Sequence, residues 1–368
     1  MKKPSIVKGW NIPKSEYEQV HNNNGLLKLV TEFTNVCNLS CLGCFTKKQS
    51  NSFTPKRKKR LESEISLDSH LKLIDEASDM GVRVVDVVGA GEPTLDPNFR
   101  KIVDHILSKN MQVVIFTHGA TKQAHELAVD YKNKDVSFFV KLWSRDSNLQ
   151  DRYVQGSVED YTKRRNEFLN SLIHLGYNSE NLGKINLDGI DYRKTRVGAD
   201  ILVMRSNLGE IPELFKYCRT ENFMPEIKTY IPEGPTRFDQ EENRLILTEP
   251  EFEELKKDKI LDKDYSDLVR KLVKIDKEEF NIEEMNTFYP QGSKCTQSMS
   301  SMYVTIQGDV RSCVGTHISY GNYPNISLKE VVEMRNEREK VGFGCIPRID
   351  EINGTGLKVP ENLLKLYQ

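Results

Sequence analysis

The feature that most restricts the fold of this chain is an alternation of two patterns between about residues 28 and 232. Short runs rich in β-branched residues alternate with longer segments whose apolar residues recur at helical spacing, which is typical of βα units with parallel strands. We predict six strands, at residues 28–34, 82–88, 112–116, 136–143, 199–204 and 226–231. We predict the intervening helices at residues 68–80, 98–109, 123–131, 158–175 and 210–221. Because six consecutive units cannot be divided into two small sheets without exposing strand edges, we expect an α/β fold with one curved sheet, a partial (β/α)6 barrel at residues 28–232.

The rest of the chain divides into three further segments. Residues 1–27 are an N-terminal extension, and residues 233–290 are a charged helical connector rich in Glu and Lys, with helices expected at 251–259 and 265–276. In the last segment, residues 291–368, a Gln-Gly-Asp turn between two apolar runs predicts a hairpin. A capping box that starts at Ser327 then opens a helix to about residue 340.

Charge and hydropathy exclude several classes of protein. The 53 basic residues nearly cancel the 54 acidic ones, so a net charge of −1 provides no overall attraction to nucleic acid, and we expect no nucleic-acid partner. The longest apolar runs have the length of strands, and no apolar block of signal-peptide length follows the N-terminus. We therefore expect no membrane segment and a cytoplasmic location. In that reducing compartment, an odd number of seven cysteines favours metal binding or catalysis over disulfides.

Three of these cysteines, Cys37, Cys41 and Cys44, form a Cys-x3-Cys-x2-Cys loop directly after the first predicted strand. A structural zinc site usually has four protein ligands, and this loop contains no fourth Cys or His. A 4Fe-4S cluster fits three thiolates better, because the missing ligand leaves one iron open to a small molecule.

The loop resembles the cluster loop of radical SAM enzymes. The resemblance implies that the open iron binds S-adenosylmethionine (SAM), that the reduced cluster cleaves it, and that the resulting 5′-deoxyadenosyl radical takes a hydrogen atom from the substrate. It also implies the partial barrel of that family and a flavodoxin or ferredoxin type reductant. The chain departs from the family at Gly43, where an aromatic residue usually precedes the third cysteine, and has Phe45 after it instead.

Further matches to this family follow the later strands. Gly89, Ala90, Gly91 and Glu92 resemble the Gly-Gly-Glu-Pro motif that binds the methionyl amine of SAM, with alanine at the second position. The resemblance assigns softer cofactor contacts to polar residues near the ends of later strands: Thr117, Ser144, Arg152 and Asn207. Ordinary polar residues at strand ends would explain Thr117 and Ser144 equally well, and Arg152 is out of register with the arginine of the family stretch.

A second group of cysteines lies in the last segment. Cys295 and Cys313 form a Cys-x12-Gly-x4-Cys pattern across the predicted hairpin, and Cys345 follows the predicted helix. This arrangement resembles the twitch or SPASM extension of radical SAM enzymes and implies a small hairpin-plus-helix domain with a second, auxiliary 4Fe-4S cluster. The fourth ligand stays open between His317, Asp350, Glu351, solvent and the substrate itself. Three unrelated buried cysteines are the alternative.

The seventh cysteine, Cys218, lies in a predicted helix. We favour a thiol packed in the core, and the rival hypothesis is a hydrogen-atom donor to a substrate radical.

The leading functional hypothesis is a radical SAM enzyme that abstracts hydrogen from an unactivated carbon of a peptide or protein, leading to a crosslink, an epimerisation or an oxidation. A dehydrogenase or epimerase of a small sugar, cyclitol or other natural-product intermediate is the close alternative. From another class, a non-catalytic iron-sulfur electron carrier or a zinc-stabilised module stays open. The basic tract at residues 47–60 is interpreted as a solvated loop.

Overall fold

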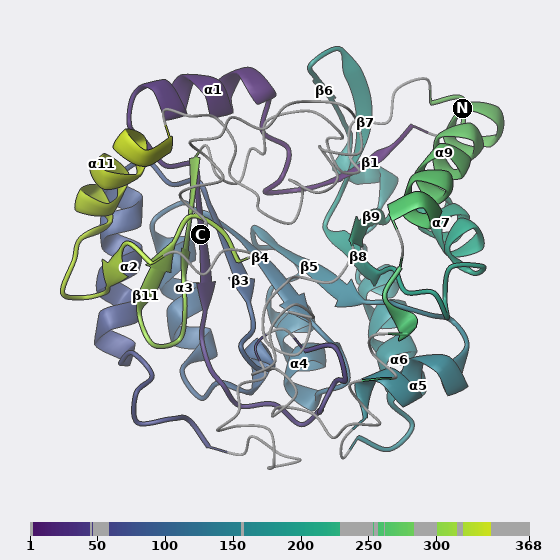
Figure 1. Ribbon diagram of the computed structural model, residues 1–368, viewed down its shortest axis with the longest axis horizontal. Coiled ribbons are helices and arrows are strands. Elements are labelled where there is room, and N and C mark those ends of the chain that lie inside the picture. Colours follow the sequence, from purple (N-terminus) through teal and green to yellow (C-terminus); the bar gives the residue numbers. More distant parts are fainter. Residues whose placement is uncertain are drawn as a thin grey trace.

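In the computed structural model, the alternating segments form one curved sheet with helices on its outer face (Figure 1). The structure describes residues 3–44, 46, 59–155, 158–228, 253, 257–260, 262–282, 300–314 and 319–339. Within these residues the main sheet has nine strands in the order β12-β11-β10-β2-β3-β4-β5-β8-β9. The prediction of an α/β fold with one curved sheet is confirmed.

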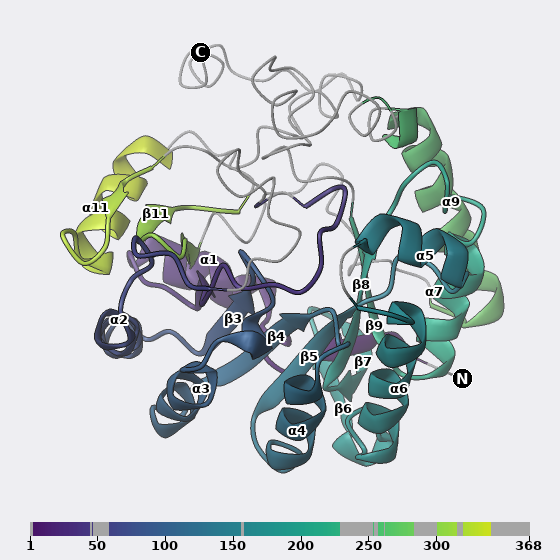
Figure 2. The ribbon, with the colours of Figure 1, turned by 90° about the horizontal axis from the view of Figure 1, so that it is seen from below.

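The six predicted strands are all present and lie side by side in parallel register. They are β2 (Lys28–Glu32), β3 (Val84–Val88), β4 (Gln112–Thr117), β5 (Val136–Lys141), β8 (Val197–Leu202) and β9 (Met224–Lys228). The predicted helices between them are α2 (Leu67–Asp79), α3 (Phe99–Ser108), α4 (Lys122–Asp130), α6 (Tyr161–His174) and α7 (Ile211–Thr220). Figure 2 shows α2, α3, α4 and α6 in a row along the outer side of the sheet.

The two faces of the sheet have different chemistry, as β8 illustrates. Val197, Ala199 and Ile201 are fully buried in the large core beneath the helices. Because successive side chains of a strand point to opposite faces, Asp200 and Leu202 lie on the concave face. The outer face therefore holds the core, and the concave face is free to carry polar groups.

Several elements before β8 were not predicted from the sequence. They are β1 (Ser5–Val7), α1 (Lys14–Asn22), α5 (Ser147–Val154), β6 (Lys184–Leu187) and β7 (Ile190–Thr195), together with two 3-10 turns at Pro93–Leu95 and Glu180–Leu182. Strands β1, β7 and β6 form a separate three-stranded sheet. The hairpin formed by β6 and β7 had a signal in the sequence, the Asp188-Gly189 pair. Both residues adopt the positive φ that a type I′ turn requires.

The N-terminal extension closes the amino-terminal end of the concave face. The centroid of the Trp10 ring lies 4.6 Å from that of Phe139 and 6.0 Å from that of Phe116. The indole N–H of Trp10 donates a hydrogen bond of 3.0 Å to the Asp86 carboxylate. Lys28 pairs with the same carboxylate at 3.5 Å. This stack fills the amino-terminal end of the concave face.

The C-terminal hairpin continues the main sheet. Its strands are β10 (Ser301–Val304), β11 (Asp309–Arg311) and β12 (Gly321–Asn322), and β10 pairs in parallel with β2. Glu32 at the end of β2 accepts hydrogen bonds from the Tyr303 hydroxyl at 2.6 Å and from the Ile306 amide at 3.0 Å. The predicted hairpin is thus present and is anchored to the barrel by a buried carboxylate.

Two further helices complete the described chain. They are α9 (Asp262–Glu279) and α11 (Leu328–Glu339). The fully buried Arg219 of α7 pairs with Asp276 of α9 at 2.8 Å, which joins the connector to the barrel. Most of the predicted helix at 251–259 lies outside the described residues. No helix within the described residues is both long and apolar enough to cross a bilayer.

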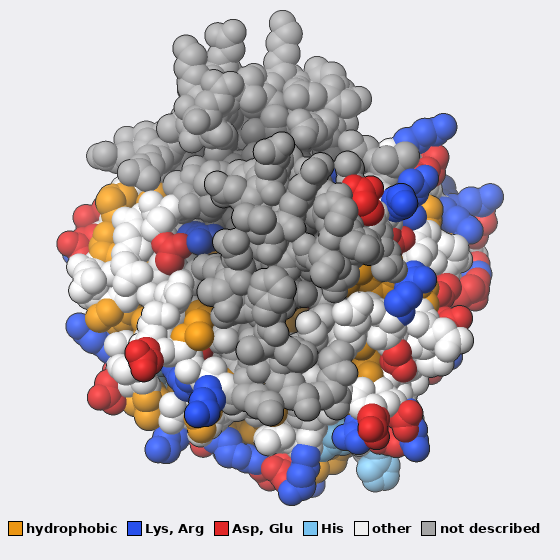
Figure 3. Space-filling model, turned by 60° about the horizontal axis from the view of Figure 1, so that its bottom comes forward, with side chains coloured by type: hydrophobic (Ala, Val, Ile, Leu, Met, Phe, Trp, Pro, Cys, Tyr) orange, Lys and Arg blue, Asp and Glu red, His pale blue; other side chains and the backbone are white. Residues whose placement is uncertain are grey.

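The surface carries charges of both signs. On the face in Figure 3, Lys and Arg side chains are interspersed with Asp and Glu over the described residues. That distribution matches the near-zero net charge of the sequence.

Candidate functional site

The candidate site lies in the loops that follow the parallel strands. The three cysteines follow β2, the glycine turn at residues 89–92 follows β3, and Thr117 ends β4. Ser144 comes shortly after β5, and Asn207 shortly after β8. Because parallel strands share one carboxyl edge, the fold brings these sequence-distant residues to the same end of the sheet.

Helix α5 and the strand ends hold the cysteine loop in place. Cys37 and Cys41 are buried in a small apolar cluster with Trp143, and Cys44 packs against it. The amide of Leu42 donates to the Tyr153 carbonyl at 3.0 Å. Since α5 was not predicted, this support for the loop could not be foreseen.

Each of the three cysteine sulfurs has a polar neighbour. The Leu39 amide donates to Cys37 Sγ at 3.5 Å, and the Lys141 ammonium donates to Cys41 Sγ at 3.3 Å. Cys44 Sγ lies 3.2 Å from the hydroxyl oxygen of Thr46. Burial alone would lower the pKa of Lys141, but the combined charges of Cys41, Tyr161, Cys44 and Asp200 outweigh it, so the pKa is raised and the ammonium stays charged.

This set of donors fits an iron-sulfur cluster. Three thiols from one loop, with polar partners that suit negatively charged sulfur, are what a three-thiolate 4Fe-4S cluster needs from the protein. Within the described part of the chain, no three His, Cys, Asp or Glu side chains converge so as to hold one metal ion. A cluster does not demand this convergence, because each thiolate binds a different iron.

The glycine turn is pressed against the start of the cysteine loop. The Gly91 amide donates to the Thr34 carbonyl, and the Glu92 amide donates to the Val36 carbonyl. Both hydrogen bonds are 2.8 Å long. A Cβ atom on Gly91 would lie 2.1 Å from the Val36 carbonyl oxygen. The Thr46 hydroxyl also donates to the Ala90 carbonyl at 2.6 Å. Position 91 therefore requires glycine because the backbone of the glycine turn contacts the backbone at the start of the cysteine loop, whichever ligand binds there.

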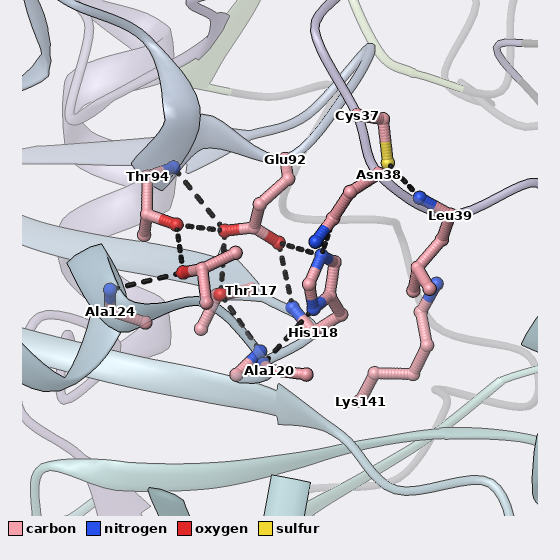
Figure 4. A network of polar contacts seen from close by, with 12 residues as sticks. Cys37, Asn38, Leu39, Glu92, Thr94, Thr117, His118, Ala120, Ala124 and Lys141 are labelled. Atoms are coloured by element: carbon pink, nitrogen blue, oxygen red, sulfur yellow. Dashed lines mark hydrogen bonds and ion pairs between the residues drawn. The ribbon is translucent and has the colours of Figure 1, made fainter. Parts of the chain in front are cut away.

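The Glu92 carboxylate ties the ends of β3 and β4 together (Figure 4). It is buried and accepts hydrogen bonds from the hydroxyls of Thr94 at 2.8 Å and Thr117 at 2.7 Å, and from the His118 amide at 2.9 Å. His118 Nε2 lies 3.4 Å from the same carboxylate and 2.8 Å from Asn38 Oδ1 of the cysteine loop. Burial lowers the pKa of His118 and outweighs the opposing charge of Glu92, so the imidazole is neutral near pH 7.

Ser144 and Asn207 lie close together and make bonds within the protein. The Ser144 hydroxyl donates to Glu210 at 2.8 Å. The Asn207 amide donates to the Trp143 carbonyl at 2.7 Å and to the Leu202 carbonyl at 2.8 Å. Asn207 thus bridges the ends of β5 and β8, so any contact with a cofactor would come in addition to a structural role.

Arg152 lies on α5, and Cys218 lies on α7. Arg152 is exposed, with its guanidinium 5.2 Å from the Tyr153 ring centroid. Cys218 is fully buried in the large outer core, where burial raises the pKa of its thiol to about 12. This location supports the interpretation of Cys218 as a packed core thiol.

The second cysteine group is only partly described. Cys313 follows β11 and is half-buried. Cys295 and Cys345 lie outside the described residues, as do the candidate fourth ligands His317, Asp350 and Glu351. The auxiliary cluster stays a prediction.

A charged layer on the concave face was missed by sequence reasoning. Lys141, Asp200 and Glu226 are aligned in register across β5, β8 and β9. The Lys228 ammonium lies 2.7 Å from Asp200 and 3.5 Å from Glu226. The sequence signal for this layer was a charged residue within a largely apolar strand, at a position that faces the concave side. Lys141 at the end of β5 is an example.

Glu226 is expected to make stability depend on pH. Burial and the charge of Asp200 outweigh Lys228 and raise the pKa of Glu226 from 4.5 to about 7. Its stabilising contribution is present below pH 4.5 and is lost as pH rises through about 7. We expect Glu226→Gln to remove on the order of 2 kcal/mol of the decline in unfolding free energy between pH 5 and pH 8.

Urea denaturation at both pH values measures this effect. Glu126→Gln, on the surface of α4, is the matched control and should decline like the wild type. Equal declines in the wild type and Glu226→Gln would contradict the prediction.

Comparison with known proteins supports the architecture. A family model described as the Radical SAM superfamily matches residues 31–174, from β2 to the end of α6. The chain also has the fold of Streptococcus suis SuiB, solved with its precursor peptide SuiA, with a TM-score of 0.58 at 15% identity. That match covers 86% of this chain and 67% of SuiB.

Two curated proteins are similar to parts of the chain. One, from Pyrococcus furiosus, is named a tungsten-containing aldehyde ferredoxin oxidoreductase cofactor-modifying protein, and is 24% identical over 196 residues, 51% of this chain and 47% of that protein. The other is the Bacillus subtilis antilisterial bacteriocin subtilosin biosynthesis protein AlbA, 27% identical over 124 residues, 33% of this chain and 25% of AlbA. The matched stretches thus span half or less of these relatives.

Proposed function

Because the Radical SAM superfamily model matches residues 31–174, we propose that the protein is a radical SAM enzyme that abstracts a hydrogen atom from an unactivated carbon of a peptide. One observation carries this proposal: the three-cysteine loop and the glycine turn are hydrogen-bonded to each other at the carboxyl edge of a parallel sheet. The outcome for the peptide would be a crosslink, an epimerisation or an oxidation.

Different residues of the chain would bind the cluster and SAM. Cys37, Cys41 and Cys44 would hold a 4Fe-4S cluster, and the backbone of the glycine turn would face the amino-acid end of SAM. When bound and reduced, these cofactors supply the cleavage of SAM to a 5′-deoxyadenosyl radical. The protein contributes position and the exclusion of water. Burial of Cys37 and Cys41 beside Trp143 supports this second role.

The peptide substrate is supported by the relatives. AlbA is named for the biosynthesis of a bacteriocin, and SuiB was solved with a precursor peptide. A flavodoxin or ferredoxin type reductant, and an auxiliary cluster on Cys295, Cys313 and Cys345, belong to the same proposal.

Anaerobic reconstitution tests the reaction. Protein reduced with dithionite should convert SAM to 5′-deoxyadenosine, slowly even without substrate. Metal analysis should give about four iron atoms per chain if only the loop binds a cluster, and about eight with the auxiliary cluster. Zinc without iron and sulfide would overturn the proposal.

Deuterium transfer tests the substrate class. The reconstituted enzyme, reduced with dithionite, is incubated with SAM and either the peptide fraction or the small-molecule fraction of cells grown on deuterated medium. Deuterium in 5′-deoxyadenosine from the peptide fraction supports a peptide substrate. Transfer from the small-molecule fraction alone would point to the dehydrogenase or epimerase alternative instead.

A further inference from the structure

Lys141 has an environment unlike that of the other lysines on the concave face. It is the last residue of β5, is half-buried, and directs its ammonium to Cys41 Sγ at 3.3 Å. The same ammonium lies 4.6 Å from the centroid of the Trp143 ring. Figure 4 shows the side chain extending toward the loop that carries Cys37 and Leu39.

The neighbouring lysines are neutralised by carboxylates. Lys28 pairs with Asp86 at 3.5 Å, and Lys228 pairs with Asp200 at 2.7 Å. Among the residues that the structure describes, no carboxylate forms an ion pair with Lys141. Its ammonium instead contacts the Cys41 sulfur, and the charges of Cys44 and Asp200 act on it without an ion pair.

A fixed positive charge beside a cluster changes the free energy of adding an electron. Reduction adds negative charge to a site that is already anionic, and a nearby ammonium stabilises the reduced state more than the oxidised state. Hydrogen bonds to cluster sulfurs act in the same direction and are a recognised influence on reduction potential.

We propose that Lys141 is a positioning residue that raises the reduction potential of the cluster held by Cys37, Cys41 and Cys44. The inference rests on the proposed function, since it requires that cluster. A purely structural Lys141, packed on Trp143, would leave the potential unchanged when the charge is removed and the packing is kept.

Redox titration of the reconstituted cluster, followed by electron paramagnetic resonance without SAM, tests this inference. Lys141→Met keeps most of the side-chain packing but removes the charge, so we expect a more negative midpoint potential. Lys141→Arg keeps the charge and should stay close to the wild type. Lys101→Met, which removes an exposed charge on α3, is the control and should not shift the potential.

Equal potentials in the wild type and Lys141→Met, at equal iron content, would overturn the inference. If the Met variant does not retain iron, Lys141→Gln is titrated instead, because it keeps an uncharged N–H donor. Loss of iron from both variants, with full iron in Lys141→Arg, would also overturn it by assigning Lys141 to cluster retention. Absence of iron from the wild type would overturn the proposed function itself.

Discussion

Replacement of Cys41 by alanine is expected to lower the iron bound by the loop from about four atoms per chain to near zero and to abolish 5′-deoxyadenosine formation. The reason is that the loop provides three thiolates, and a cluster with two protein ligands has two irons open to solvent. Cys41 is also the sulfur that Lys141 contacts, so its loss leaves a positive charge without its partner. Iron and sulfide analysis, with chromatographic detection of 5′-deoxyadenosine, measures both effects.

The matched control is Cys218→Ala. It removes a thiol that is fully buried in the outer core, away from the cysteine loop's cluster of side chains. Iron content and slow SAM cleavage without substrate should match the wild type, although removal of a buried sulfur lowers stability. Full iron and undiminished cleavage in Cys41→Ala would contradict the assignment of the loop.

Gly91→Ala is expected to have the second largest effect, because the added methyl group meets backbone that cannot move aside cheaply. Its Cβ would lie 2.1 Å from the Val36 carbonyl oxygen and 2.7 Å from that of Asn35. Relief of this clash must displace residues 35–36, directly before Cys37, and break the hydrogen bond from the Glu92 amide to Val36. We expect a destabilisation on the order of 3 kcal/mol, the upper end for overpacking, and loss of most of the iron.

Thermal unfolding and iron analysis of the reconstituted variant test this prediction. Gly209→Ala is the control, because a Cβ on Gly209 has no neighbour within 4 Å and its φ is not positive. That variant should match the wild type in iron content and stability. Normal iron in Gly91→Ala would show that the turn does not position the cysteine loop.

Much of the fold could be predicted because its signals are local. The alternation of patterns identified all six central strands, with shifts of a few residues such as Val197–Leu202 for the predicted strand at 199–204. The missed elements were short or polar. Strand β1 has three residues, and β6 exposes alternate side chains at a sheet edge, so neither has an apolar run long enough to predict a strand.

The candidate site was predicted where its chemistry is carried by spacing. The cysteines at positions 37, 41 and 44 and the glycine turn stand out in the sequence because each is a short, unusual pattern. Lys141 and Glu226 do not stand out, because single charged residues occur throughout the chain. The roles assigned to Ser144, Arg152 and Asn207 came only from resemblance and stay predictions.

The sequence by itself determined the order of strands and helices and the presence of a three-thiol loop, since periodicity and spacing act over a few neighbouring residues. Only the tertiary structure decided which distant residues meet. Lys141 reaches Cys41 across 100 positions of sequence, and Lys228 meets Asp200 because β8 and β9 pair in one register. Strand register and loop path arise from packing of the whole core, so no local pattern encodes these contacts.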